Sequence, residues 1–218
     1  MRVLSICLFL ITQTLLHAED GITVNCRFLS LDTKALPPML APSTGGAEAE
    51  LIVPTSALSE PIACFSKTDT LTFFAAADHK PLATAKIPAN IKSAILCFVP
   101  AGTATNSLPW RIFIVENSPK NCPPGGVFVA NFHSQDIRFV IGETKLILHP
   151  GSTYGVPMPT KRNEGNMASV MFQFQKGDAW VGATDTMLRF LPRISYFMFA
   201  SMDATTGRPQ VTSFQNID

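Results

Sequence analysis

Charged residues are scarce in this 218-residue chain: they make up 15% of it, against about 25% in typical globular domains. Basic and acidic residues are nearly balanced, at 17 and 16, and no run of Lys or Arg occurs. Binding to nucleic acid or to an anionic membrane surface relies on a basic patch or stripe. The sequence therefore predicts neither as a partner.

Familiar catalytic and cofactor motifs are missing too. Nucleophile elbows have the pattern G-x-S-x-G, but the nearest match, GSTYG, has Thr153 where the serine would stand. No phosphate-binding loop and no G-x-G-x-x-G occurs, so no nucleotide cofactor is indicated. We expect no cofactor, and we expect a non-enzyme rather than an enzyme.

Sustained helical periodicity is also absent, and short apolar runs take its place. The chain contains 17 Pro and 13 Gly, and these separate runs of about five to nine residues rich in Val, Ile, Phe and Thr, a pattern typical of strands. Residues 94–99 and 194–200 are apolar at nearly every position, which is typical of central strands covered on both faces. The sequence predicts an all-β protein, an antiparallel β-sandwich.

The division of the chain is indicated by its turn-rich segments. Residues 117–126, NSPKNCPPGG, favour a domain boundary. We expect two small packed sandwich domains, 19–118 and 127–218, joined by a Pro/Gly-rich linker, 119–126. One continuous sandwich is the alternative, and the halves show no residue-level repeat. Residues 32–50 predict a mobile surface loop.

The first 18 residues have the form of a secretory signal peptide, with cleavage after Ala18. Arg2 precedes an apolar run, 3–11, which Thr12 interrupts. A membrane anchor is the alternative, but the run is short for a span of about 20 residues. We expect a periplasmic or extracellular protein with no transmembrane segment in the mature chain.

Removal of this leader would leave four cysteines of the five. In an exported chain they permit two disulfides in three connectivities. The lack of C-x-x-C argues against zinc-ribbon and thioredoxin-like sites, and buried free thiols are the alternative. The disulfide candidates are Cys26, Cys64, Cys97 and Cys122.

The segment 136–151 predicts a hairpin with Gly142 at its turn, and it carries the best candidates for a metal site. His133, Asp136 and His149 would lie near its open end, and N/O ligands of this kind suit divalent metals. Glu143 lies at the tip, on the order of 15–20 Å away, and is excluded from that site. Ordinary strand-end roles are the competing interpretation, which we favour.

Glycan binding needs exposed flat rings. Most aromatic residues here are Phe, 16 of them, and Phe in alternating strands is usually core. The candidates for stacking are Trp110, Tyr154 and Trp180, and a role in covering the core is the alternative.

Across residues 110–157 the turn pattern resembles that of a group of uncharacterised secreted bacterial β-rich proteins. Asn131 within a strand, Gly142 at a hairpin and the L-x-P-G turn at 148–151 carry the resemblance. It implies an exported β-rich protein and supplies no activity. Cys122 departs from the pattern of the group.

These observations favour an exported, non-enzymatic protein of a bacterial envelope with a role in assembly or protein binding. Envelope proteins are the expected partners, and the oligomeric state stays open. The alternatives are a metal-dependent hydrolase using His133, Asp136 and His149, and a glycan-binding module.

Overall fold

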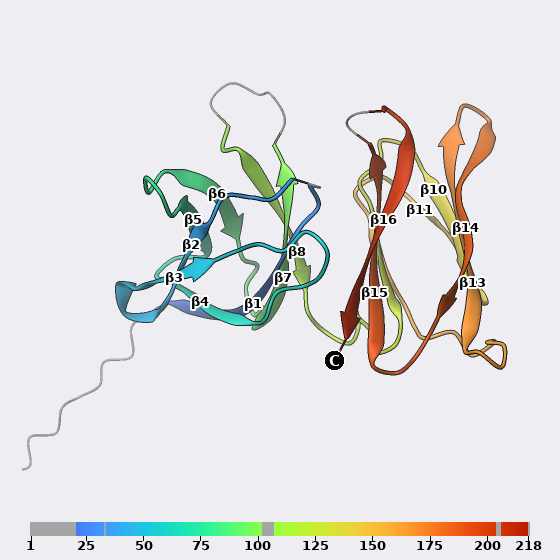
Figure 1. The fold of residues 1–218 in the computed structure, drawn as a ribbon, viewed down its shortest axis with the longest axis horizontal. Helices are drawn as coiled ribbons and strands as arrows, with labels where there is room; N and C mark the ends of the chain where they lie inside the picture. Colours follow the sequence, from blue (N-terminus) through green and yellow to red (C-terminus); the bar gives the residue numbers. More distant parts are fainter. Residues whose placement is uncertain (1–20, 33, 102–106, 204–205, 218) are drawn as a thin grey trace, which may run out of the picture.

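A computed structural model describes residues 21–217 apart from 33, 102–106 and 204–205. The expected signal peptide, 1–18, and its cleavage after Ala18 lie outside the described residues. The described chain forms 16 strands in four four-stranded sheets, with one 3₁₀ turn at Thr44–Gly46 and no α-helix (Figure 1). The prediction of an all-β sandwich fold is confirmed.

The strands before residue 117 form one sandwich. Its two sheets have the strand orders β4-β1-β7-β8 and β3-β2-β5-β6, here called the N-inner and N-outer sheets. The strands are β1 (Ile22–Ser30), β2 (Met39–Pro42), β3 (Glu48–Leu51), β4 (Ile62–Ser66), β5 (Thr70–Ala75), β6 (Pro81–Lys86), β7 (Ser93–Pro100) and β8 (Trp110–Glu116).

The strands after residue 126 form a second sandwich. Its sheets, the C-inner and C-outer sheets, have the orders β12-β9-β15-β16 and β11-β10-β13-β14. The strands are β9 (Val127–Asn131), β10 (Ile137–Ile141), β11 (Thr144–Leu148), β12 (Thr153–Val156), β13 (Met167–Lys176), β14 (Ala179–Arg189), β15 (Ile194–Met202) and β16 (Pro209–Ile217).

The two sandwiches have the same topology. Adding eight to every strand number of the first sandwich reproduces both strand orders of the second. Each inner sheet even contains a parallel pair at the same place, β1 with β7 and β9 with β15, among otherwise antiparallel ladders. The chain is therefore a structural repeat, although its halves share no visible residue pattern.

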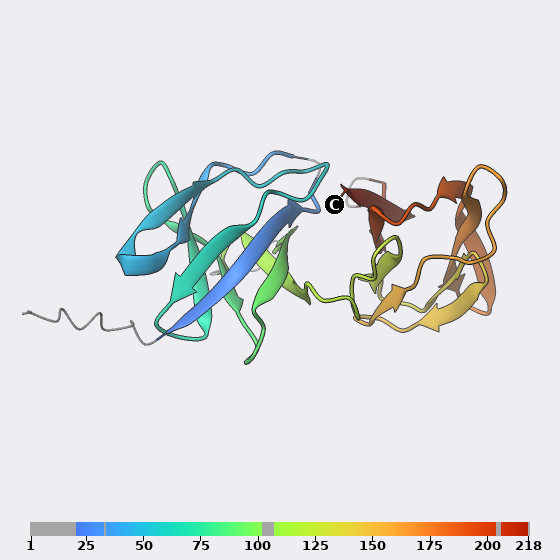
Figure 2. The ribbon, with the colours of Figure 1, turned by 90° about the horizontal axis from the view of Figure 1, so that it is seen from below.

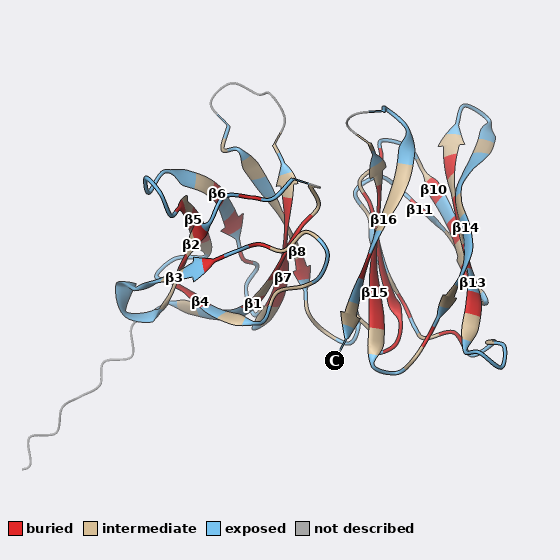
Figure 3. Ribbon diagram, in the orientation of Figure 1, coloured by how far each residue is buried: buried red, intermediate tan, exposed pale blue. Residues whose placement is uncertain are grey.

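Each sandwich has its own core, built from alternate residues of its strands. Phe28, Phe73 and Phe98 form edge-on and tilted ring contacts inside the first. Phe139 and Phe172 stack inside the second, with centroids 5.7 Å apart. Figure 3 shows buried positions alternating with less buried ones along the strands.

The inner sheets are buried on both faces because they pack against each other. A third apolar cluster joins them, with Leu29, Ile95 and Cys97 on one side and Phe197 and Phe199 on the other. This explains why residues 94–99 and 194–200 are apolar on both faces, as the sequence predicts for covered central strands. The layers thus run outer, inner, inner, outer across the molecule (Figures 1 and 2).

Three connections besides the apolar cluster hold the sandwiches together. The segment 117–126 runs from β8 to β9, as seen from below in Figure 2. On β1, Arg27 donates to the carbonyl of Ser59 at 2.9 Å and to Oδ1 of Asn216 on β16 at 2.7 Å. Beside it, Ala57 forms a parallel bridge with Gln215.

One sequence interpretation is wrong. The segment 32–50, expected as a mobile loop, contains β2 and most of β3. Met39 and Ala41 alternate inward and are fully buried, and β2 pairs with both β3 and β5. The prolines do not prevent this, because Pro37 and Pro38 precede the strand and Pro42 is its last residue, positions where a missing N–H is tolerated.

Candidate functional site

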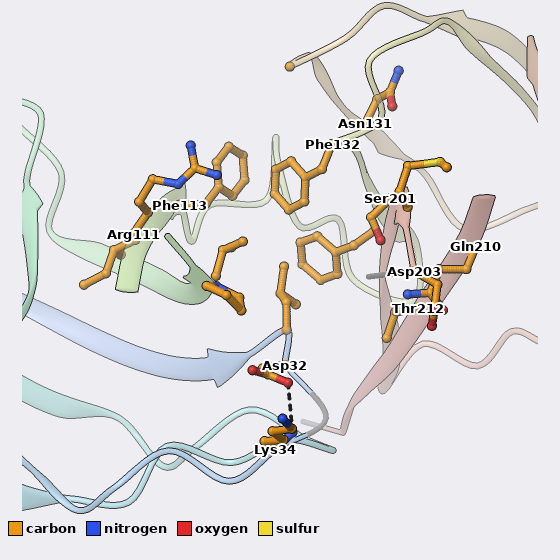
Figure 4. A pocket seen from close by; sticks show the side chains of 17 residues that line it. Asp32, Lys34, Arg111, Phe113, Asn131, Phe132, Ser201, Asp203, Gln210 and Thr212 are labelled. Atoms are coloured by element: carbon orange, nitrogen blue, oxygen red, sulfur yellow. Dashed lines mark hydrogen bonds between the residues drawn. The ribbon is translucent and has the colours of Figure 1, made fainter. Parts of the chain in front are cut away.

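A cleft of about 920 Å³ lies between the two inner sheets. The register of the strands explains where it lies. Toward segment 117–126 the facing positions are large and apolar, such as Val115, Phe128 and Phe214. At the opposite end, where β8 begins and β9 ends, the cleft separates the two inner sheets. Figure 4 shows the side chains that line this opening.

The two walls come from equivalent parts of the repeat. One wall consists of the end of β7, the beginning of β8 and the residues that follow β1. The other consists of the end of β9, the end of β15 and the beginning of β16. In the β-ladders Val99 pairs with Arg111, and at the equivalent place Ser201 pairs with Gln210. The cleft is therefore built symmetrically in its backbone.

Its side chains are not symmetric. On the first wall Leu31, Val99 and Phe113 provide apolar surface, and Arg111 and Lys34 provide two cations. The equivalent partners of Val99, Arg111 and Phe113 are Ser201, Gln210 and Thr212, all three of them polar. One wall is thus suited to apolar and anionic groups and the other to hydrogen bonding.

An aromatic contact spans the cleft. Phe113 meets Phe132 edge to face, with centroids 4.8 Å apart, and Phe132 stacks on the buried Phe199 at 5.7 Å. Phe113 and Phe132 are only half-buried. They form an apolar base that is accessible from the opening.

Four charged side chains line the cleft, and they differ in whether they have hydrogen-bond partners. The Asp32 carboxylate accepts a hydrogen bond from the Lys34 backbone N–H at 3.0 Å. Asp203 accepts bonds from the N–H and the hydroxyl of Thr206, at 2.6 and 2.9 Å. The guanidinium of Arg111 and the ammonium of Lys34 have no partner among the described residues. In Figure 4 the Arg111 head lies beside Phe113, away from both acids.

The predicted metal ligands form a pair rather than a set of three. Asp136 and His149 are in contact, with Oδ1 and Nδ1 2.9 Å apart at the surface. His133 is buried, accepts the backbone N–H of Gln135 on its Nδ1 at 3.0 Å and lies edge-on to Phe174. No group of three His, Cys, Asp or Glu side chains within the described ranges is placed to hold a metal ion. The three-residue metal site is therefore not supported.

The hairpin 136–151 acts as scaffold in the structure. At its open end Asn131 donates to the carbonyls of Gln135 and Leu148, at 2.9 and 2.8 Å, and accepts the N–H of His133. At its tip Glu143 accepts the backbone N–H and the hydroxyl of Thr160, both at 2.8 Å. These bonds lower the pKa of Glu143 to about 2.

The three aromatic residues considered for glycan stacking lie on three different sheets. Trp110 opens β8 and packs partly against the first core. Tyr154 is on β12, at the edge of the C-inner sheet, and is 43% exposed. Trp180 is on β14 of the C-outer sheet, under the guanidinium of Arg138 at 4.7 Å. They form no common platform.

The four cysteines are free thiols in the structure, so the expected disulfides are not found. Cys26 and Cys64 are neighbours in the first core, and this contact, together with burial, raises the pKa of Cys26. The ladder pairs Cys26 with Ile62 and Val24 with Cys64, so the cysteines are diagonal. Diagonal Cα atoms lie about 7–8 Å apart, beyond the usual span of a disulfide.

The other two thiols lie at the junction of the sandwiches. Cys97 is fully buried on the opposite face of the N-inner sheet from Cys26, and this burial raises its pKa. Cys122, in segment 117–126, packs against the same cluster. Burial and the nearby Glu116 raise the pKa of Cys122 to about 12.

The cleft residues were not found from the sequence. Arg111, Phe113, Phe132 and Ser201 have no motif, because each belongs to the cleft only through the packing of the two inner sheets. One feature of the sequence does point to the cleft. In residues 94–99 and 194–200 the residues that face the sandwich core are apolar, and so are the alternate residues that face the other way. These alternate residues mark the faces on which the two sandwiches meet.

Fold and cleft together define the class of molecule: a β-protein of two repeated sandwiches with a cleft between their inner sheets. No family model matches the chain, and no curated protein matches it either. In the part of the chain that the structure describes, no helix is long and apolar enough to cross a membrane.

Proposed function

We propose that this protein is an exported, non-catalytic binding protein of a bacterial envelope that holds part of another protein between its two sandwiches. The observation that carries the proposal is the cleft itself. Its volume of about 920 Å³ lies within the range typical of binding pockets, about 300–1,000 Å³, and junctions of domains are a preferred place for them.

The chemistry of the lining supports binding rather than catalysis. The described residues that line the cleft include no histidine, cysteine or glutamate, the side chains that most often act as general acids, bases or nucleophiles together with aspartate. Both aspartates of the cleft accept hydrogen bonds within their own turns. What remains toward the opening is apolar surface, two cations and three uncharged polar side chains.

Rigid walls also support this function. Each wall belongs to an inner sheet that is fixed on one face by a sandwich core and on the other by the shared apolar cluster. Sites on such elements lose little conformational entropy when a partner is ordered against them.

The test is site-specific photo-crosslinking in cells that produce the protein. A benzophenone side chain replaces Ser201 in the cleft, and in the control it replaces Ser169, an exposed residue of β13 on the outer face of the C-outer sheet. We expect a discrete adduct with one polypeptide from position 201 and none from position 169, identified by mass spectrometry of the exported fraction. Equal labelling from both positions, or no adduct from position 201, would contradict the proposal.

A further inference from the structure

The asymmetry of the cleft indicates which kind of protein segment it holds. Resting on the proposed function, we propose that the occupant is an extended segment with an acidic side chain two residues away from an apolar one, the spacing at which both point to the same side. The acidic side chain pairs with Arg111, and the apolar one lies on Phe113 and Phe132.

The charges of the cleft balance in number, and its two cations without a partner favour an acidic side chain on the occupant. Of its four charged groups, the two carboxylates accept hydrogen bonds from their own loops, whereas Arg111 and Lys34 end without a protein partner among the described residues. A guanidinium is well suited to two parallel hydrogen bonds with a carboxylate. The Arg111 head lies beside the ring of Phe113 (Figure 4), so a ligand that reaches it also meets apolar surface.

The opposite wall favours an extended backbone. The side chains of Ser201, Gln210 and Thr212 point into the cleft, are half-buried and have no hydrogen-bond partner among the described residues. A peptide backbone presents N–H and C=O groups all along its length, and these groups can bond to hydroxyl and amide side chains. In an extended chain successive side chains point to opposite sides, so alternate residues meet the wall of Arg111.

The two walls differ at equivalent positions of the repeat, and this difference sets which side of the occupant faces which wall. A symmetric cleft would accept a segment in either orientation. Here Arg111 occupies the position equivalent to Gln210 of the second half, and Phe113 the position equivalent to Thr212. A segment therefore binds with its acidic and apolar side chains on the side of Arg111 and Phe113, and the apolar one also meets Phe132 at the base of the cleft.

The experiment measures binding of blocked peptides by titration calorimetry at low salt. The probe is acetyl-Thr-Asp-Thr-Phe-Thr-Val-amide, in which Asp and Phe share one side of the extended chain, and the matched probe has Asn in place of Asp. We expect the Asn probe to bind about tenfold more weakly, because a charge-assisted hydrogen bond is lost. Arg111→Gln should weaken the Asp probe by a similar factor and leave the Asn probe unchanged. Lys176→Gln, which removes an exposed cation of the distant β13 end, is the control and should change neither.

Other outcomes separate this inference from the proposed function. Equal affinity for both probes would overturn the role of the carboxylate. Tighter binding of an Asn probe with a free carboxyl end would overturn the internal acidic residue in favour of a chain terminus. Binding of oligogalacturonate that depends on Arg111, with no peptide bound, would overturn a polypeptide occupant. If either of the first two results is obtained and photo-crosslinking from position 201 still gives its adduct, the proposed function stands and only this inference fails.

Discussion

The ring of Phe113, from the first sandwich, meets the ring of Phe132, from the second, with an interplanar angle of 81° and centroids 4.8 Å apart. The contact lies at the point where the apolar junction of the inner sheets gives way to the open cleft. It couples the two halves where they begin to separate.

A double-mutant cycle with Phe113→Leu and Phe132→Leu should measure this coupling. Leucine keeps apolar volume and removes the ring–ring contact, so the interaction energy should be about 0.5–1.5 kcal/mol. The free energies of unfolding come from urea titrations of the two single variants and the double variant. Additive effects within experimental error would show that the rings do not interact.

Arg27 should contribute to stability through its position between the sandwiches. Arg27→Ala leaves the Ser59 carbonyl and the Asn216 side chain without this donor, and the expected cost is about 1–3 kcal/mol in the free energy of unfolding. Arg208→Ala, on an exposed turn, is the matched control. Equal stability of the two variants would show that the bonds of Arg27 add nothing.

Gly142 should tolerate a side chain less well than Gly177, although both have positive φ at hairpin turns. A Cβ at Gly142 would lie 2.6 Å from Cβ of Pro159, whereas nothing lies within 4 Å at Gly177. Gly177→Ala should cost only the backbone term, about 1–2 kcal/mol. Gly142→Ala should add a packing cost of about 1–3 kcal/mol. Thermal unfolding of both variants compares them, and equal losses would show that Pro159 moves aside freely.

Glu143 should make stability depend on pH in acid. Its pKa in the folded protein is about 2, below the ordinary value of 4.5, mainly because the Thr160 N–H and hydroxyl bond to its carboxylate. A lowered pKa stabilises the fold above 4.5, and this contribution disappears as pH falls from 4.5 to 2.

In Glu143→Gln that part of the pH dependence should be missing. Urea midpoints measured at intervals from pH 6 to pH 2 check this, with Glu164→Gln, an exposed residue of the 157–166 region, as control. An unchanged slope in Glu143→Gln would assign the acid sensitivity to other carboxylates.

Local patterns predicted much of the fold and little of the site. Alternation along β13, with Val170, Phe172 and Phe174 inward, follows from the period of a strand and is readable in the sequence. The turn at Gly177 is equally local. The wrong prediction of a loop at 32–50 has a physical cause. Met39 and Ala41 belong to a strand that is fixed by pairing with other strands, which a local pattern does not contain. The prolines around them locally favour a loop.

The candidate site depends on relationships that no local pattern contains. Arg111 and Ser201 lie on facing sheets only because Ile95 and Cys97 pack against Phe197 and Phe199. The same holds for the repeat: equal strand order is preserved while the residues differ, so a comparison of letters does not reveal it. His133 shows the opposite case. The sequence identifies it as a possible metal ligand because it is a histidine, but its role in a turn follows from its surroundings in the fold.

Burial of both faces of the inner sheets has a consequence for the solubility of each half of the chain. Either half alone would present a broad apolar face with Phe197 and Phe199, or with Leu29 and Ile95, to water, and exposed patches of this kind promote aggregation. A protease that cuts within 117–126 should therefore produce two fragments that stay together and remain soluble as a pair. The halves behave as a dimer whose subunits are made on one chain, at a fixed ratio of one to one.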